Sequence, residues 1–192
     1  MTRTEGLVFA PATADRWDDL ERLFRDGHPF PGCWCMYRRN RRKDFEKNYG
    51  EENRKNFRRI IESGDVPGIL AYSGGEPAGW YSVAPRETFP VQDRSPVLKR
   101  VDDEPVWSIT CFFIPERHRR SGMSEALVGA AVDYVEERGG GVVEAYPLIP
   151  EKSKNPEISA YMGLFSTYMK MGFREVSRRS PMRPVVRYYL DG

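Results

Sequence analysis

The residues with the most distinctive chemical pattern lie between Arg117 and Ser124. Arg117, Arg119 and Arg120 precede Gly122 and Ser124, after an apolar run and before a helical pattern. The first turn of a helix leaves backbone N–H groups without partners and carries the positive end of the helix dipole. Gly122 allows the backbone to approach a ligand closely, and the arginines and the Ser124 hydroxyl add donors. This pattern predicts a phosphate-binding turn, with a tight strand-to-helix turn and solvated arginines as the alternative.

A buried strand and a long helix must position this turn. Residues 106–114 are apolar at nearly every position, which is typical of a strand buried on both faces and central in a sheet. After the turn, apolar residues recur at helical spacing until the glycines of residues 139–141 end the helix. The residues of this helical stripe are Met123, Ala126, Leu127, Ala130, Ala131, Tyr134 and Val135.

The rest of the chain also alternates strand and helix patterns. Residues 7–10 predict a first strand, and residues 17–24 predict an amphipathic helix after it. An apolar stripe over residues 45–61 predicts one further helix, and residues 68–83 predict a hairpin with a glycine-rich turn. The loop that follows, residues 85–104, is long enough to suggest a functional role.

Composition narrows the class of protein. With 192 residues, the chain has the length of one domain with a single core. Its 40% hydrophobic and 30% charged residues argue against disorder, and no apolar run approaches the roughly 20 residues of a membrane helix. The N-terminus lacks the ~7 to 15 apolar residues of a signal peptide. We therefore expect a cytoplasmic protein whose three cysteines are reduced. The net charge of +2 argues against bulk attraction to nucleic acid or membranes.

Two motifs resemble a known family. Arg119-x-x-Gly122-x-Ser124 after an apolar strand is similar to the pyrophosphate motif of GNAT acyltransferases, (Gln/Arg)-x-x-Gly-x-(Gly/Ala). The family also ends a later helix with Tyr-x-x-x-Gly-Phe, and residues 168–173 of this chain match that pattern. The resemblance implies a single α/β domain over residues 1–192, with a mixed central sheet flanked by helices on both faces. It also implies that residues 11–64 form a helical lid over the acceptor site.

The resemblance further implies an N-acetyltransferase. Acetyl-CoA would be the cosubstrate, and a primary amine of a small molecule or peptide would attack its thioester directly. The implied cofactor-binding residues are Cys111, Phe112, Phe113, Ile114, Arg119, Arg120, Ser121, Gly122, Met123, Ser124 and Ser166. Tyr168 matches the family's frequent general acid. Because residues 107–113 contain no carboxylate, Glu144 and Glu87 become the candidate bases, directly or through water.

Cys33-Trp34-Cys35 has three interpretations. With His28 it could form part of a metal site, but two thiols and one imidazole are an incomplete set of ligands. One thiol could act as a nucleophile if a base or a cation lay beside it. The third interpretation is an apolar wall of the acceptor pocket. We favour this wall and expect no metal.

Two further functions stay open at this point. The missing strand carboxylate permits a non-catalytic module that binds CoA as a regulatory ligand. Residues 38–59 carry ten basic against four acidic residues, and the run 38–43 has aromatic neighbours suited to nucleic acid. A solvated helix face is the favoured interpretation of that run, and an acidic acceptor or the CoA 3′-phosphate are others. The sequence also leaves a homodimer open.

Overall fold

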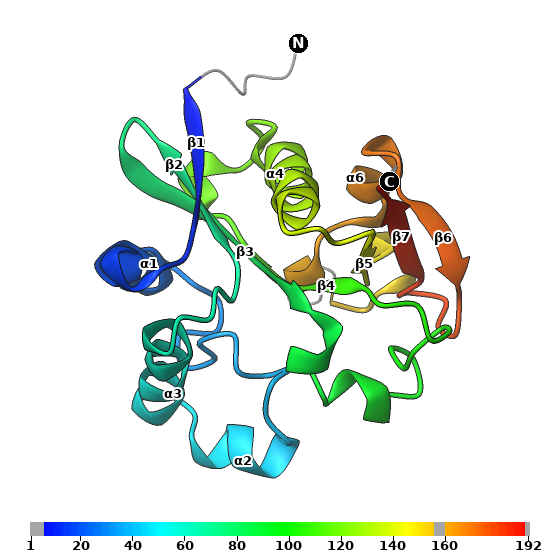
Figure 1. The fold of residues 1–192 in the computed structure, drawn as a ribbon, viewed down its shortest axis with the longest axis horizontal. Helices are drawn as coiled ribbons and strands as arrows, with labels where there is room; N and C mark the ends of the chain where they lie inside the picture. The colour runs from blue at the N-terminus through cyan, green and yellow to red at the C-terminus, as the bar shows by residue number, and fades with distance from the viewer. Residues whose placement is uncertain (1–5, 156–159, 191–192) are drawn as a thin grey trace.

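The strand predicted at residues 106–114 forms β4 (Trp107–Phe113), the central strand of a seven-stranded sheet (Figure 1). The structure is a computed structural model that describes residues 6–155 and 160–190. The other strands are β1 (Leu7–Pro11), β2 (Ile69–Ser73), β3 (Glu76–Pro85), β5 (Val142–Ala145), β6 (Arg174–Ser177) and β7 (Val185–Tyr189). Their order is β1-β2-β3-β4-β5-β7-β6, with β4 and β5 parallel and the other neighbours antiparallel. The predicted mixed sheet is confirmed.

Helices cover both faces of this sheet. They are α1 (Trp17–Arg25), α2 (Arg42–Lys47), α3 (Glu51–Glu62), α4 (Met123–Glu137) and α6 (Phe165–Lys170). Successive side chains of a strand point to opposite faces. Leu70 and Trp80 therefore pack in the cluster that contains α1 and α3, whereas Ile69 and Tyr81 pack in the cluster that contains α4. Burial on both sides explains why these strands are apolar throughout.

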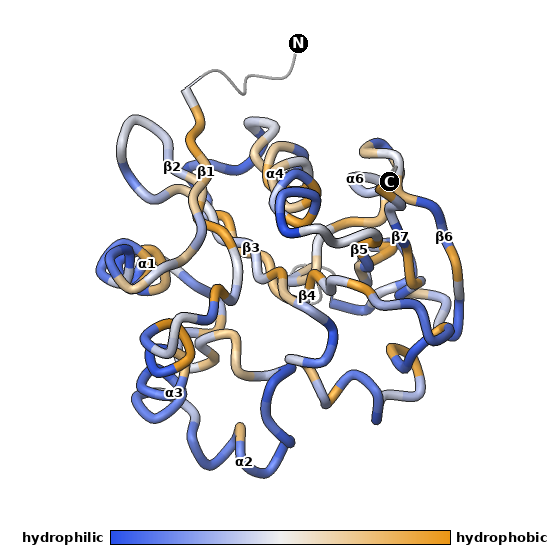
Figure 2. Tube along the Cα trace, in the orientation of Figure 1, coloured by the Kyte–Doolittle hydropathy of each residue, from blue (hydrophilic) through white to orange (hydrophobic). Residues whose placement is uncertain are grey.

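Polarity follows the same arrangement. Figure 2 shows hydrophobic residues along the strands and hydrophilic residues over α2 and the outer side of α3. Within the residues that the structure describes, no helix combines the length and the apolar character needed to span a bilayer.

The single helix predicted over residues 45–61 is wrong, because the structure contains two. Gly50 separates α2 from α3 and has a φ of +97°, a conformation that cannot continue a right-handed helix. The break is anchored by the Gly32 carbonyl, which accepts hydrogen bonds from the Gly50 N–H at 3.0 Å and from the buried Asn53 amide at 3.2 Å. The apolar stripe continues across the break because Phe45 of α2 packs against the cluster that contains Phe57 and Ile61 of α3.

Candidate active site

The sheet opens beside β4. The parallel pairing of β4 with β5 stops at Ile109, and β5 ends at Ala145. In the described part of the chain, residues 110–113 of β4 therefore have no strand partner on that side. The register of β4 against β3 also shifts at Thr110, which bulges the strand. A strand edge of this kind offers backbone N–H and C=O groups to an extended ligand that contains amides.

A cavity of about 1090 Å³ lies along this open edge. Most of the predicted cofactor-binding residues line it: Cys111, Phe112, Phe113, Ile114, Arg119, Arg120, Gly122, Met123 and Ser124. Tyr168 lines it as well. Two predicted residues, Ser121 and Ser166, are not among its lining residues, and the Ser121 hydroxyl instead donates to the His118 carbonyl at 2.7 Å.

One end of the cavity carries backbone N–H groups without partners. Gly122 is the residue before the first turn of α4 and has a φ of +82°, where glycine carries no side-chain penalty. Within the described residues, the backbone N–H groups of residues 120–124 donate no hydrogen bond. They therefore remain available at the positive end of the α4 dipole. The Arg119 side chain is held over the turn by its bond to the Ile114 carbonyl at 3.0 Å. This arrangement fits a phosphate or diphosphate.

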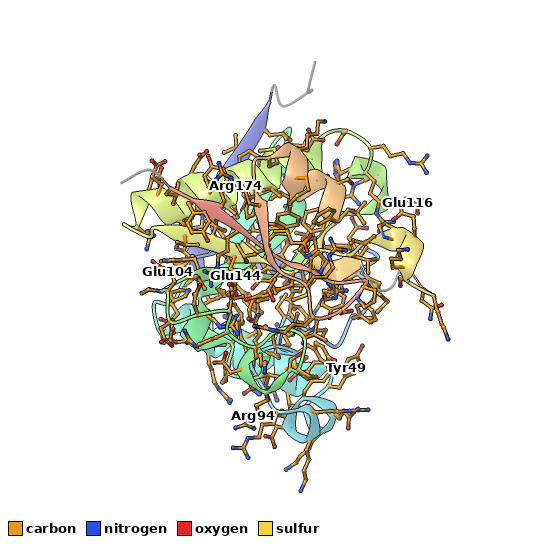
Figure 3. All side chains as sticks on the ribbon, turned by 90° about the vertical axis from the view of Figure 1, so that its right-hand side faces the viewer. Tyr49, Arg94, Glu104, Glu116, Glu144 and Arg174 are labelled. Atoms are coloured by element: carbon orange, nitrogen blue, oxygen red, sulfur yellow. The ribbon has the colours of Figure 1, made fainter. Side chains whose placement is uncertain are left out.

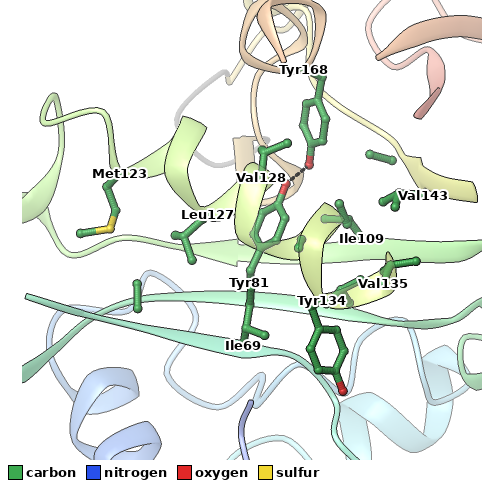
Figure 4. Close-up of a cluster of buried hydrophobic side chains, with 14 of the residues drawn as sticks. Ile69, Tyr81, Ile109, Met123, Leu127, Val128, Tyr134, Val135, Val143 and Tyr168 are labelled. Carbon is green, nitrogen blue, oxygen red and sulfur yellow. Dashed lines mark hydrogen bonds between the residues drawn. The ribbon is translucent and has the colours of Figure 1, made fainter. Parts of the chain in front are cut away.

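Tyr168 on α6 is fully buried and is among the residues that line the cavity. Its hydroxyl donates to the Met162 carbonyl at 3.2 Å and contacts the Tyr81 hydroxyl (Figure 4). Burial raises the pKa of Tyr168 above its ordinary value, so its phenol is protonated at neutral pH. The cavity lining thus includes a proton donor held in place by two partners.

The N-terminal part of the chain forms the opposite wall. His28, Cys33 and Cys35 line the cavity from the loop before α2, together with Arg38. The Arg38 guanidinium donates to the Tyr161 hydroxyl and lies 5.8 Å from the centre of the Tyr161 ring. Neither Arg38 nor Tyr161 was a predicted site residue. The aromatic density around residues 28–37 was a signal for this wall, whereas Tyr161 carries no local signal.

A family model described as the acetyltransferase (GNAT) family matches residues 17–161. The chain belongs to the GNAT family. No curated protein matches its sequence. Among solved structures, a GNAT acetyltransferase from Streptococcus agalactiae 2603 has a TM-score of 0.60 at 13% identity, over 98% of each chain.

Two further similar structures contain coenzyme A or acetyl-CoA. PaiA N-acetyltransferase from Thermoplasma acidophilum, in complex with coenzyme A, has a TM-score of 0.55 at 10% identity, over 96% of this chain and 99% of that one. Arabidopsis thaliana NAA60, in complex with acetyl-CoA, has a TM-score of 0.50 at 18% identity, over the same shares. At such identities the similarity shows a common fold. The predicted family and fold are confirmed.

The structure of this GNAT protein places the two candidate bases outside the cavity. Glu144 on β5 is 1% exposed, and its carboxylate accepts from Arg86 at 2.8 Å, Tyr146 at 2.6 Å and Arg187 at 2.9 Å. Figure 3 shows Glu144 in the interior of the molecule. Its position is explained by these two guanidinium groups, which need a buried counter-charge.

Glu87 lies on the surface. Its carboxylate pairs with Arg100 at 2.8 Å, and this hydrogen bond lowers the pKa of Glu87. Among the described residues, the carboxylates that do line the cavity are Glu116 and Glu125, on either side of the arginine turn. Neither predicted base is therefore among the residues that line the cavity.

The thiols and the imidazole of the N-terminal wall form no recognisable metal site. In residues 6–155 and 160–190, no group of three or more His, Cys, Asp or Glu side chains is arranged to hold a metal ion. Cys33 and Cys35 line the cavity, as the pocket-wall interpretation expects.

Proposed function

We propose that this protein transfers an acetyl group from acetyl-CoA to a primary amine of a small molecule or peptide. The observation that carries the proposal is the set of unpartnered N–H groups at residues 120–124, next to an open strand edge that lines the same cavity. The diphosphate of CoA would bind at those N–H groups. The pantetheine amides would pair with residues 111–114, which directs the thioester toward the interior of the cavity.

The proposed reaction is a direct attack. The neutral amine nitrogen adds to the thioester carbon, so that a C–N bond forms and the C–S bond breaks. The departing CoA thiolate takes a proton from the Tyr168 hydroxyl, and the proton that the attacking nitrogen gives up returns through water in the cavity to the Tyr168 phenolate. Residues 11–64 would act as the lid, because their loop before α2 supplies the wall that faces β4. The proposed location of this activity is the cytoplasm.

Binding and turnover measurements test this proposal. Isothermal titration with acetyl-CoA and with CoA should give dissociation constants in the micromolar to sub-millimolar range. Release of free CoA thiol across a panel of primary amines should then identify an acceptor. The absence of a predicted base in the cavity favours a regulatory CoA-binding module as the second function. That module would bind CoA without thiol release on any amine, and no CoA binding at all would contradict both functions.

Replacing Tyr168 with phenylalanine should lower kcat by about 100-fold, the lower end of what a positioned general acid contributes. The buried ring stays in place, so the Kd for CoA should stay within about twofold of wild type. Tyr81→Phe is the matched control, because it removes the other hydroxyl of the pair and leaves the proton donor. Equal kcat values for the two variants would show that Tyr168 is a packing residue.

Arg38 indicates an acceptor that carries an anion as well as its amine. The Nε of Arg38 is buried and has no hydrogen-bond partner among the described residues. A carboxylate or phosphate on the acceptor would satisfy it. Arg38→Gln should therefore raise KM for an anionic amine by about 10- to 100-fold, as expected for a lost bond of roughly 1.5–3 kcal/mol to a charged group.

The control for Arg38 is Arg42→Gln. Arg42 lies on α2 outside the cavity lining and pairs with the exposed Glu46 at 2.7 Å. Steady-state kinetics with an anionic amine and its uncharged analogue measure the effect. A KM that rises equally for both amines, or equally in both variants, would exclude anion recognition by Arg38.

A further inference from the structure

All three cysteines of the chain meet in the cavity, although they come from distant segments. Cys33 and Cys35 belong to the loop before α2, and Cys111 belongs to the open part of β4. All three are free thiols. Cys111 is half-buried and lines the cavity, so small molecules that enter the cavity come next to this residue.

Two side chains favour the thiolate form of Cys111. Cys35 belongs to the buried cluster against which Cys111 packs, His28 lines the same cavity, and both lower the pKa of Cys111. The His28 Nδ1 accepts from the Phe30 backbone N–H at 3.0 Å, which leaves Nε2 as the ring nitrogen that carries the proton. The hydrogen bond from Cys35 is the main cause that lowers the pKa of Cys111 to about 6, against the opposing effect of burial.

Cys35 remains a protonated thiol next to that thiolate. Burial raises the pKa of Cys35 well above its ordinary value. The Trp80 indole N–H donates to the Cys35 sulfur at 3.0 Å and fixes its position. Trp34 and Cys35 both have left-handed backbones, with φ of +48° and +52°. Strain of this kind costs about 1–3 kcal/mol per residue and is concentrated at functional sites.

We propose that Cys111 is a site of oxidation by hydroperoxides and that Cys35 converts the product into a disulfide across the cavity. A half-buried thiolate in a cavity wall, packed against a cluster that holds a second thiol, has the two groups that reversible thiol oxidation needs. The proposed oxidation is separate from acetyl transfer, and the disulfide can form whether or not the protein transfers acetyl groups.

The two steps balance as follows. The Cys111 thiolate attacks one peroxide oxygen, the O–O bond breaks, and the products are Cys111 sulfenic acid and a hydroxide that takes a proton to become water. The Cys35 sulfur then attacks the sulfenic sulfur, the S–O bond breaks, and the hydroxyl leaves as water with the Cys35 proton. The two thiols lose two electrons in total and the hydrogen peroxide is reduced to two waters.

The disulfide would join the N-terminal wall to the open edge of β4. Because residues 111–114 are the proposed pantetheine contact, the oxidised protein should bind acetyl-CoA at least about tenfold more weakly, and a dithiol reductant should restore binding. This consequence rests on the proposed function, whereas formation of the disulfide does not.

Mass spectrometry on the folded protein tests the proposal. Wild-type protein treated with a small excess of hydrogen peroxide, then alkylated under denaturing conditions, should lose two of its three free thiols and yield a peptide that links Cys35 to Cys111. Cys33→Ser is the matched control and should behave as wild type. Burial, with the Cys111 charge nearby, raises the pKa of Cys33 to about 12 and makes it unreactive.

The other two serine variants separate the steps. Cys35→Ser should stop at the sulfenic acid, which a 1,3-diketone probe would label on Cys111, and Cys111→Ser should form neither product. Thermal denaturation checks that each variant is folded. A link that includes Cys33, or an unmodified Cys111 in folded wild type, would overturn the proposal. Titration of the reduced protein with CoA reports separately on the proposed function.

Discussion

Gly122→Asp is expected to weaken CoA binding by two orders of magnitude or more while the fold is retained. The new carboxylate would occupy the point where the free N–H groups of residues 120–124 converge. Placing like charges against each other costs several kcal/mol, and about 3 kcal/mol corresponds to roughly a 100-fold change in Kd. Isothermal titration with CoA measures the effect.

Gly122→Asn is the control that isolates charge. Asparagine and aspartate are equal in size, and both tolerate the left-handed conformation that Gly122 adopts with its φ of +82°. The asparagine variant should therefore lose much less affinity. If both variants bind CoA equally, the loss comes from bulk or backbone strain, and the diphosphate does not bind at this turn.

The second large effect is a loss of folding stability when the buried carboxylate of Glu144 is removed. Glu144→Gln should lower the free energy of unfolding by about 3 kcal/mol, because breaking a buried ion pair typically costs 3–5 kcal/mol. The substitution leaves the Arg86 and Arg187 guanidiniums, whose side chains are 1% and 3% exposed, without their shared carboxylate. Each retains one other acid, Asp93 at 2.7 Å and Asp102 at 2.7 Å, which keeps the expected loss near the lower limit.

Urea denaturation of Glu144→Gln and Glu87→Gln measures this difference. Glu87 pairs with Arg100 on the surface, and exposed pairs contribute about 0–1 kcal/mol, so its variant should unfold almost like wild type. The two variants therefore compare how much each predicted base, Glu144 and Glu87, contributes to the free energy of unfolding. A Glu144 variant of unchanged stability but without turnover would show that this carboxylate takes part in the reaction.

Local features of the candidate site could be predicted from the sequence. The turn around Gly122 depends on a buried strand, a glycine and the first turn of a helix, all adjacent in the chain. Helix and strand periodicity likewise predicted α1, α4 and the β2–β3 hairpin. The prediction of one helix over residues 45–61 was wrong because the apolar stripe does not record the left-handed Gly50.

The structural role of Glu144 could not be predicted in this way, because it depends on partners that are distant in the sequence. Glu144 is held by Arg86, 58 positions earlier, and by Arg187, 43 positions later. No spacing within β5 reveals either contact. Residues 85–104 were predicted as a loop with a functional role, and the structure shows that Arg86 anchors the first part of this loop to the sheet through the same buried network.

The sequence by itself determined the family, the mixed sheet and the strand-to-helix turn at Gly122, because each depends on backbone geometry that neighbouring residues dictate. Only the tertiary structure decided which side chains share the cavity. In the folded structure Glu144 lies in a buried ion pair. Cys111 of β4 packs against the cluster that contains Cys35 of the N-terminal wall. Burial and charge at a side chain are set by residues far away in the chain, and those contacts exist only after folding.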